Sequence, residues 1–145
     1  MNEQDLKIIK YDLYWELIRG RRSNKGNRWF NFLWPTDEEI DESFTPKFAY
    51  LNYLGPGDVA GNHYHITKGE FFCPMGPMEL YLEDPKTGRK EKIEMSLGDK
   101  EKYTMYYVPT GIAHAVRNPG NDFSPLVVLS GESLSSEKTI EYKII

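Results

Sequence analysis

The chain is poor in cysteine: Cys73 is its only one in 145 residues, so no disulfide can form within it. A domain of this length buries about 70% of the surface that its unfolded chain exposes, so it needs no disulfide bonds to stabilise its core. No apolar run approaches the roughly 18 residues of a membrane span. The first residues also lack the basic start and apolar run of a signal peptide. We therefore expect one cytoplasmic domain that does not meet a membrane.

An excess of positive charge is missing as well. The chain has 18 basic and 22 acidic residues, which gives a formal net charge of −4. Nucleic-acid binding normally depends on a basic face, so we expect no nucleic-acid partner. Long stretches with helical periodicity are also absent, and this argues against a parallel α/β sheet.

From residue 47 onward the sequence alternates between short apolar runs and turns, which is typical of an all-β domain. Proline, glycine, asparagine and aspartate separate the runs, and strands at this spacing indicate a sandwich or a barrel. The predicted strands are Phe48–Leu54, Gly69–Cys73, Met78–Glu83, Lys90–Met95, Tyr103–Val108, Ala113–Arg117 and Leu126–Leu129.

Residues 1–46 do not show this regular alternation of short apolar runs and turns, and we expect them to form an N-terminal extension ahead of a barrel at residues 47–145. Ile8 and Ile9 predict a short strand, Asp12 to Ile18 a helical turn, and Thr36 to Glu39 the start of a short helix. The aromatic run from Trp29 to Trp34 is expected to plug the barrel or to form a dimer contact.

Two histidines, His63 and His65, stand on either side of Tyr64. Side chains alternate between the faces of a β-strand, so both imidazoles point to one side and can bind one ion. Glu70 follows five residues after His65. A turn at Thr67 to Gly69 lets the next strand return its carboxylate toward the histidines.

The third histidine, His114, follows the turn that Pro109 and Gly111 predict. Two or three imidazoles with one carboxylate suit a divalent transition metal such as Fe, Mn, Ni, Cu, Co or Zn. A histidine in a strand often serves instead as a hydrogen-bonded structural residue. Because every histidine of the chain falls in one of two turn-bounded segments, we favour metal binding.

These segments resemble the two cupin motifs. Residues 57–70 are similar to the first motif, in which a glycine precedes His-x-His and a glutamate follows, and residues 109–118 are similar to the second. The resemblance implies a jelly-roll barrel, the cupin double-stranded β-helix. It also implies a metal held by His63, His65, Glu70 and His114, and a homodimer in which an N-terminal strand packs across the partner.

Within the cupins, the chain resembles the dTDP-4-dehydrorhamnose 3,5-epimerase-like group (the RmlC-like jelly rolls). The similar segments are residues 26–30, 61–64, 84–88 and 108–114. This likeness implies that His63 is a base that removes a proton next to a keto group. That group needs no metal, commonly carries glutamine where His65 stands, and has a catalytic tyrosine that would fall in Leu126–Glu132, where this chain has none.

The chain also resembles the metal-dependent sugar-phosphate isomerase cupins of archaea, at residues 61–65, 107–109, 113–114 and 118–121 and at Glu70. There a metal would polarise the substrate and Glu70 would transfer the proton.

Three hypotheses follow. The first is a metal-binding isomerase or epimerase of a small carbohydrate derivative, a sugar phosphate or nucleotide sugar, with His63 and Glu70 as its catalytic residues. The second is an iron-dependent dioxygenase of a small molecule. The third is a cupin that binds a small ligand without catalysis.

Overall fold

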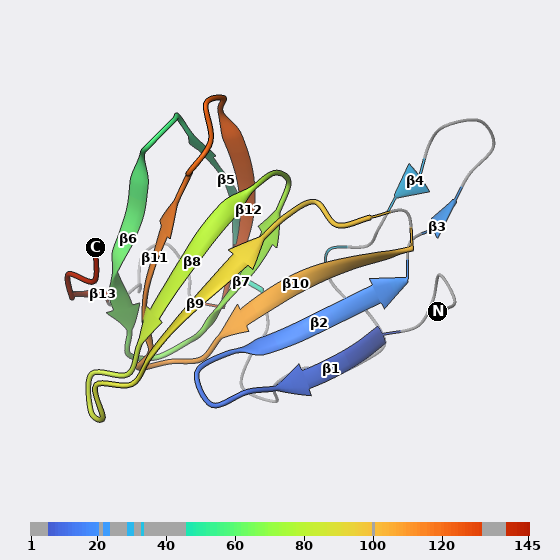
Figure 1. Ribbon diagram of the computed structural model, residues 1–145. Helices are drawn as coiled ribbons and strands as arrows, with labels where there is room; N and C mark the ends of the chain where they lie inside the picture. Colours follow the sequence, from blue (N-terminus) through green and yellow to red (C-terminus); the bar gives the residue numbers. More distant parts are fainter. Residues whose placement is uncertain are drawn as a thin grey trace.

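A computed structural model describes residues 6–20, 22–23, 29–30, 33, 46–99, 101–131 and 139–145, with the backbone alone at 22–23 and 29–30. The described residues form strands and connecting turns (Figure 1). The strands are β1 (Leu6–Lys10), β2 (Trp15–Gly20), β3 (Arg22–Ser23), β4 (Trp29–Phe30), β5 (Phe48–Leu54), β6 (Val59–His65), β7 (Glu70–Pro74), β8 (Met78–Glu83), β9 (Lys90–Met95), β10 (Lys102–Val108), β11 (Ala113–Arg117), β12 (Ser124–Ser130) and β13 (Thr139–Glu141).

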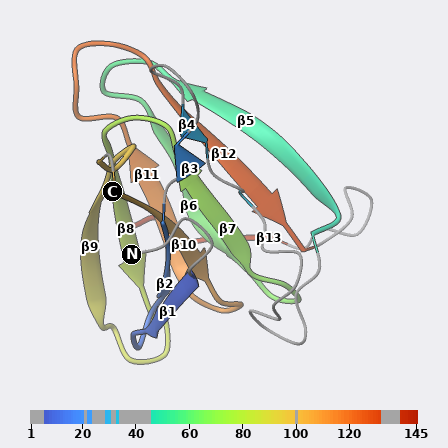
Figure 2. The ribbon, with the colours of Figure 1, turned by 90° about the vertical axis from the view of Figure 1, so that its right-hand side faces the viewer.

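Two antiparallel sheets make up the jelly roll. The large sheet has the strand order β1-β2-β10-β7-β12-β5, and the small sheet has the order β13-β6-β11-β8-β9. β3 and β4 pair with each other in a separate two-stranded sheet. In the turned view, β9 and β5 lie on opposite sides of the molecule (Figure 2). Because chain neighbours such as β6 and β7 belong to different sheets, the turns between them bring residues of both sheets together.

The main hydrophobic core lies between the two sheets. It combines inward side chains of the small sheet, such as Leu80 and Leu82, with Phe72, Val108 and Val128 of the large sheet. Alternation along each strand sends every second side chain to this layer. The inner faces of the two sheets therefore enclose a space in which side chains from both sheets can form a functional site.

Around β7, the large sheet is buried on its other face as well. Phe71 and Cys73 alternate with Phe72 along β7 and pack with Leu17, Met105 and Tyr107 in a second cluster. Every residue of β7 is buried. This is the pattern of a strand covered on both faces, and it gives Cys73 the role of a small buried hydrophobe.

The all-β jelly-roll prediction is confirmed, and the first strand lies at β1, as Ile8 and Ile9 predicted. The helical turn predicted from Asp12 to Ile18 is wrong, because residues from Trp15 onward form β2. Trp15 and Leu17 recur every second residue, which is the period of a strand, and β2 finds hydrogen-bonding partners in β1 and β10.

β1 and β2 thereby become part of the large sheet, and β1 pairs with β2 of its own chain. The predicted boundary between residues 46 and 47 and the homodimer stay predictions. The helix predicted at residues 36–39 lies outside the described residues, as do Phe32 and Trp34 of the aromatic run from Trp29 to Trp34. No helix in the described part of the chain has the length and apolar character needed to cross a membrane.

Candidate functional site

Four polar side chains meet between the two sheets. His63 and His65 lie on β6 and His114 lies on the neighbouring strand β11, so the small sheet contributes three imidazoles. Glu70, the first residue of β7, contributes a carboxylate from the large sheet. One ligand atom from each residue lies within 4.8 Å of the others. We call this set the histidine–glutamate cluster.

A close approach of β6 to β11 positions the histidines. His63 lies directly opposite His114, and the register of the two strands shifts between His114 and Ala115. At this shift, a Cβ atom on Gly61 would lie 2.7 Å from the carbonyl oxygen of His114. Gly61 also has a φ of 93°, in the left-handed region. Glycine is therefore required beside the cluster for both steric and conformational reasons.

Glu70 makes the shortest contact in the cluster. The Oε1 atom of Glu70 lies 2.6 Å from Nε2 of His65 and 3.2 Å from Nε2 of His114. His65, Glu70 and His114 are all nearly inaccessible, with exposed fractions of 4%, 2% and 3%. A buried carboxylate is tolerated only when it is paired, so these contacts hold the charge of Glu70 inside the protein.

The protonation states follow from the same neighbours. Burial alone would raise the pKa of Glu70, but its interactions with His114 and His65 outweigh burial and hold that pKa well below its ordinary value. The ionised carboxylate can only accept hydrogen bonds, so Nε2 of His65 donates one to it. Nε2 of His114 is buried and lies 3.2 Å from Oε1 of Glu70, but the geometry of this contact is not that of a hydrogen bond, and Nε2 makes none elsewhere in the described part of the chain.

His63 is the accessible member of the cluster. It is half-buried, and it lines a cavity of about 580 Å³ together with Thr139 and Glu141 of β13, residues 61–62 of β6 and residues 142–143. Burial, with the neighbouring His114 and His65, lowers the pKa of His63 from 6.5 to about 4. The ring is therefore neutral near pH 7, and a neutral imidazole can accept a proton or bind a cation.

Two further hydroxyl groups reach the cluster from strands that the sequence did not link to it. The hydroxyl of Tyr50 on β5 donates to Oε2 of Glu70 over 3.4 Å, and Tyr50 is 41% exposed. Oγ1 of Thr139 on β13 lies 3.5 Å from Nδ1 of His65. The alternation of Tyr50 and Asn52 along the strand Phe48–Leu54 was a weak indication in the sequence that the Tyr50 hydroxyl could reach the cluster. β13 is short and exposed, and no sequence pattern pointed to it.

The structure therefore brings together all four residues that the sequence singled out. The Thr67–Gly69 turn connects the last residue of β6 to the first of β7 and returns Glu70 to the histidines, as expected. The catalytic roles of His63 and Glu70 and the binding of a metal stay predictions at this point.

No protein-family model matches the sequence, and no curated protein matches it either. Solved structures do share its fold. The dTDP-6-deoxy-D-glucose-3,5-epimerase RmlC from Legionella pneumophila, in complex with dTDP-4-keto-L-rhamnose, is 16% identical with a TM-score of 0.76, over 95% of this chain and 79% of that one. The TDP-fucose-3,4-ketoisomerase WlaRA from Campylobacter jejuni is 22% identical with a TM-score of 0.67, over 88% of this chain and 87% of that one.

The capsular polysaccharide assembling protein CapF from Staphylococcus aureus is also similar, at 18% identity and a TM-score of 0.61. The match covers 97% of this chain but only 35% of CapF, so the chain spans about a third of that protein's length. At these identities the likeness establishes the fold alone: the chain has the jelly-roll fold of these RmlC-like structures.

Proposed function

We propose that the protein is an enzyme that epimerises or isomerises a nucleotide-linked keto sugar at the histidine–glutamate cluster. The observation that carries this proposal is the neutral, half-exposed His63 on the cavity, in front of three buried polar partners. The similar structures of a 3,5-epimerase and a 3,4-ketoisomerase support the same class of substrate. Small-molecule binding also agrees with a cavity of about 580 Å³.

His63 acts as the base in this proposal. Its ring nitrogen removes the proton from the carbon next to the keto group, and the electron pair of that C–H bond forms an enolate with its charge on the former keto oxygen. Return of a proton to the opposite face of this carbon inverts it. If the carbon carries a hydroxyl group, transfer of the hydroxyl proton to the former keto oxygen and return of a proton to the former keto carbon move the keto group by one position. A positioned base of this kind contributes about 10²- to 10⁴-fold to the rate.

Tyr50 is the acid that we assign to the second proton transfer. It faces the cluster from β5, and its backbone partner on β12 is Val128, which lies in the stretch where the epimerase-like group would carry its tyrosine. A tyrosine on the neighbouring strand can reach the same space because directly paired residues share one face of the sheet. Glu70, which accepts the Tyr50 hydrogen bond, orients this hydroxyl.

Incubation with a panel of dTDP-linked 4-keto-6-deoxy sugars tests the proposal, with products identified by NMR. The parent protein should convert at least one of them, and His63→Asn should be slower by about 10²-fold or more. Conversion that survives in His63→Asn would remove His63 from the mechanism. An inactive parent that binds the sugar nucleotide would favour a ligand-binding cupin instead.

We also propose that the histidine–glutamate cluster can hold one divalent transition metal, because its donor atoms fit such an ion. Three imidazoles and a carboxylate are the donor set that borderline metals prefer. The buried Nε2 of His114, which makes no hydrogen bond among the described residues, is an atom that a cation would satisfy. His63, His65, Glu70 and His114 would be the ligands. When bound, the cation would polarise the keto oxygen as a Lewis acid.

Metal binding and base catalysis exclude each other at His63, because a ring nitrogen that binds a cation cannot accept a proton. Elemental analysis of protein purified without a chelating tag, beside the double variant His63→Ala, His65→Ala, separates these uses. A near-stoichiometric metal in the parent that the variant loses would support the metal site, with Glu70 then transferring the proton. Iron together with oxygen consumption would favour a dioxygenase. No metal even after reconstitution would leave His63 as the base.

A further inference from the structure

Asn62 has an unusual backbone conformation next to the histidine–glutamate cluster. Its φ is 59°, and it is the only non-glycine residue with positive φ in the described part of the chain. The strand pairing explains where it stands: His63 lies opposite His114 and Gly61 lies opposite Ala115. Asn62 is therefore the extra residue of a β-bulge, and asparagine tolerates the left-handed conformation better than most residues.

This extra residue decides which way the histidines point. If the register from Gly61 and Ala115 continued without a bulge, His114 would lie opposite Asn62. A shift of one residue turns each side chain to the other face of the sheet. His63 and His65 would then leave the inner face that His114 occupies. The bulge at Asn62 is thus what allows β6 to present two imidazoles to Glu70.

Asn62 is also the point at which the segment after β13 is attached. Its Oδ1 atom accepts hydrogen bonds from the amides of Ile144 (2.8 Å) and Ile145 (3.1 Å), and its Nδ2 donates to the carbonyl oxygen of Ile145 (3.1 Å). The carbonyl oxygen of Asn62 accepts from the amide of Tyr142 over 2.9 Å. The Tyr142 hydroxyl in turn donates to Glu83 on β8.

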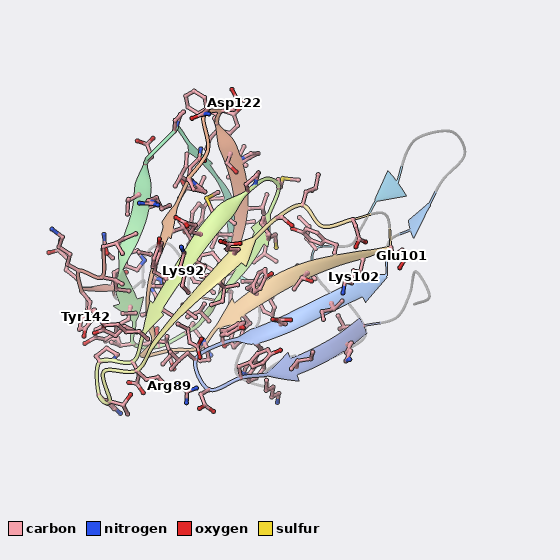
Figure 3. All side chains as sticks on the ribbon, viewed as in Figure 1. Arg89, Lys92, Glu101, Lys102, Asp122 and Tyr142 are labelled. Carbon is pink, nitrogen blue, oxygen red and sulfur yellow. The ribbon has the colours of Figure 1, made fainter. Side chains whose placement is uncertain are left out.

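These contacts tie the bulge to two strands of the small sheet. β13 pairs with β6 on its outer edge (Figure 1), and Tyr142 lies beside the end of β6 (Figure 3). The side-chain hydrogen bonds of Asn62 compensate for the ladder bonds that a bulge disrupts. A left-handed asparagine without such partners would be free to return to the extended conformation of a regular strand.

We infer that Asn62 is a positioning residue: its bulge, held by the clamp on residues 142–145, sets His63 opposite His114 in the active cluster. The inference rests on the proposed function in one respect, namely that His63 does the chemistry. Thr139, which reaches His65 from β13, is held in place by the same attachment. Asn62 itself does not touch the reacting atoms.

Three substitutions separate the backbone from the clamp. Asn62→Asp keeps the oxygen acceptor and serves as the conservative rescue, Asn62→Gly keeps the left-handed φ but loses the side-chain bonds, and Asn62→Val loses both. The chain has three histidines, so each ring can be assigned by NMR. The parent places the His63 and His114 ring centroids 4.8 Å apart, which should give an NOE between the rings.

We expect this NOE in the parent and in Asn62→Asp, a weakened one in Asn62→Gly, and none in Asn62→Val. The amides of Ile144 and Ile145 should exchange roughly tenfold faster with solvent in Asn62→Gly than in the parent, because each loses a hydrogen bond. In the active enzyme, kcat of Asn62→Gly should fall by about 100-fold from misplacement of the base, with a much smaller change in KM.

A parental NOE in a folded Asn62→Val protein would overturn the inference. If Asn62→Val does not fold, Asn62→Gly decides: a parental NOE together with faster exchange at Ile144 and Ile145 would show that the clamp does not hold the histidines. The NMR results need no substrate. An inactive parent with the predicted NOE pattern would therefore refute the proposed function and leave the positioning role of Asn62 standing.

Discussion

Replacing Glu70 by glutamine should destabilise the protein strongly, because the carboxylate of Glu70 is 2% exposed and lies against two histidines. Removing one partner of a buried ion pair costs about 3–5 kcal/mol. The amide of glutamine has nearly the same shape and can keep one neutral hydrogen bond, worth about 1 kcal/mol. We therefore expect Glu70→Gln to lower the free energy of unfolding by about 2–4 kcal/mol at pH 7.

The pH dependence of this difference checks its electrostatic origin. The folded protein holds the pKa of Glu70 below the ordinary 4.5, so the unfolded chain takes up the proton first as the pH falls. The contribution of the carboxylate is complete above pH 4.5 and decreases below it. At pH 4 the difference between the parent and Glu70→Gln should be smaller by about 0.8 kcal/mol.

Urea unfolding followed by tryptophan fluorescence at both pH values measures these quantities. Glu94→Gln on the exposed part of β9 is the matched control and should change the free energy of unfolding by less than about 0.5 kcal/mol. A Glu70→Gln protein as stable as the parent at pH 7 would refute the reasoning. So would a loss of stability that stays the same at pH 4, because its cause would then be packing rather than charge.

Further predictions concern the glycines, the acid and the base of the site. Gly61→Ala and Gly57→Ala both place a side chain at positive φ, at a cost of about 1–2 kcal/mol. Only in Gly61→Ala would the new Cβ atom also lie 2.7 Å from the carbonyl oxygen of His114, so the thermal midpoint of unfolding should fall further in Gly61→Ala than in Gly57→Ala. Equal midpoints of the two variants would contradict this. Tyr50→Phe should lower kcat by about 10²-fold with little change in the thermal midpoint, and an unchanged kcat would remove Tyr50 as the acid. His63 has a pKa lowered from 6.5 to about 4, so protonation of the unfolded chain destabilises the fold as the pH falls through this window. After allowance for the partial exposure of His63, this effect should lower the free energy of unfolding by about 1 kcal/mol between pH 7 and pH 5. Urea unfolding at the two pH values should show that His63→Gln lacks this decrease.

The sequence predicted most of the fold and the members of the site. The runs Phe48–Leu54, Met78–Glu83 and Ala113–Arg117 match strands residue for residue, because glycine- and proline-containing turns bound them. His63, His65, Glu70 and His114 could be found because a strand period of two and a short turn make local geometry predictable.

Other features depend on contacts between distant parts of the chain. The segment from Asp12 to Ile18 was predicted as a helical turn, because the pairing of β2 with β10, over 80 residues away in the sequence, is not visible locally. β13 and Thr139 likewise reach the site only through pairing with β6. Gly61 followed by Asn62 is a sequence pattern that can indicate a β-bulge. The alternation of side chains along a strand puts His63 and His65 on the same face of the sheet whether or not this bulge is present. Which face that is depends on β11.

The most direct test of the central claim is proton exchange at the substrate carbon next to the keto group. A dTDP-linked 4-keto-6-deoxy sugar is incubated in D₂O with the parent protein and with His63→Asn, and deuterium in the sugar ring is followed by NMR and mass spectrometry. The account predicts that the parent introduces deuterium next to the keto group and that His63→Asn does so at least about 10²-fold more slowly. A parent protein that binds the sugar but introduces no deuterium, or an equally fast His63→Asn, would contradict it.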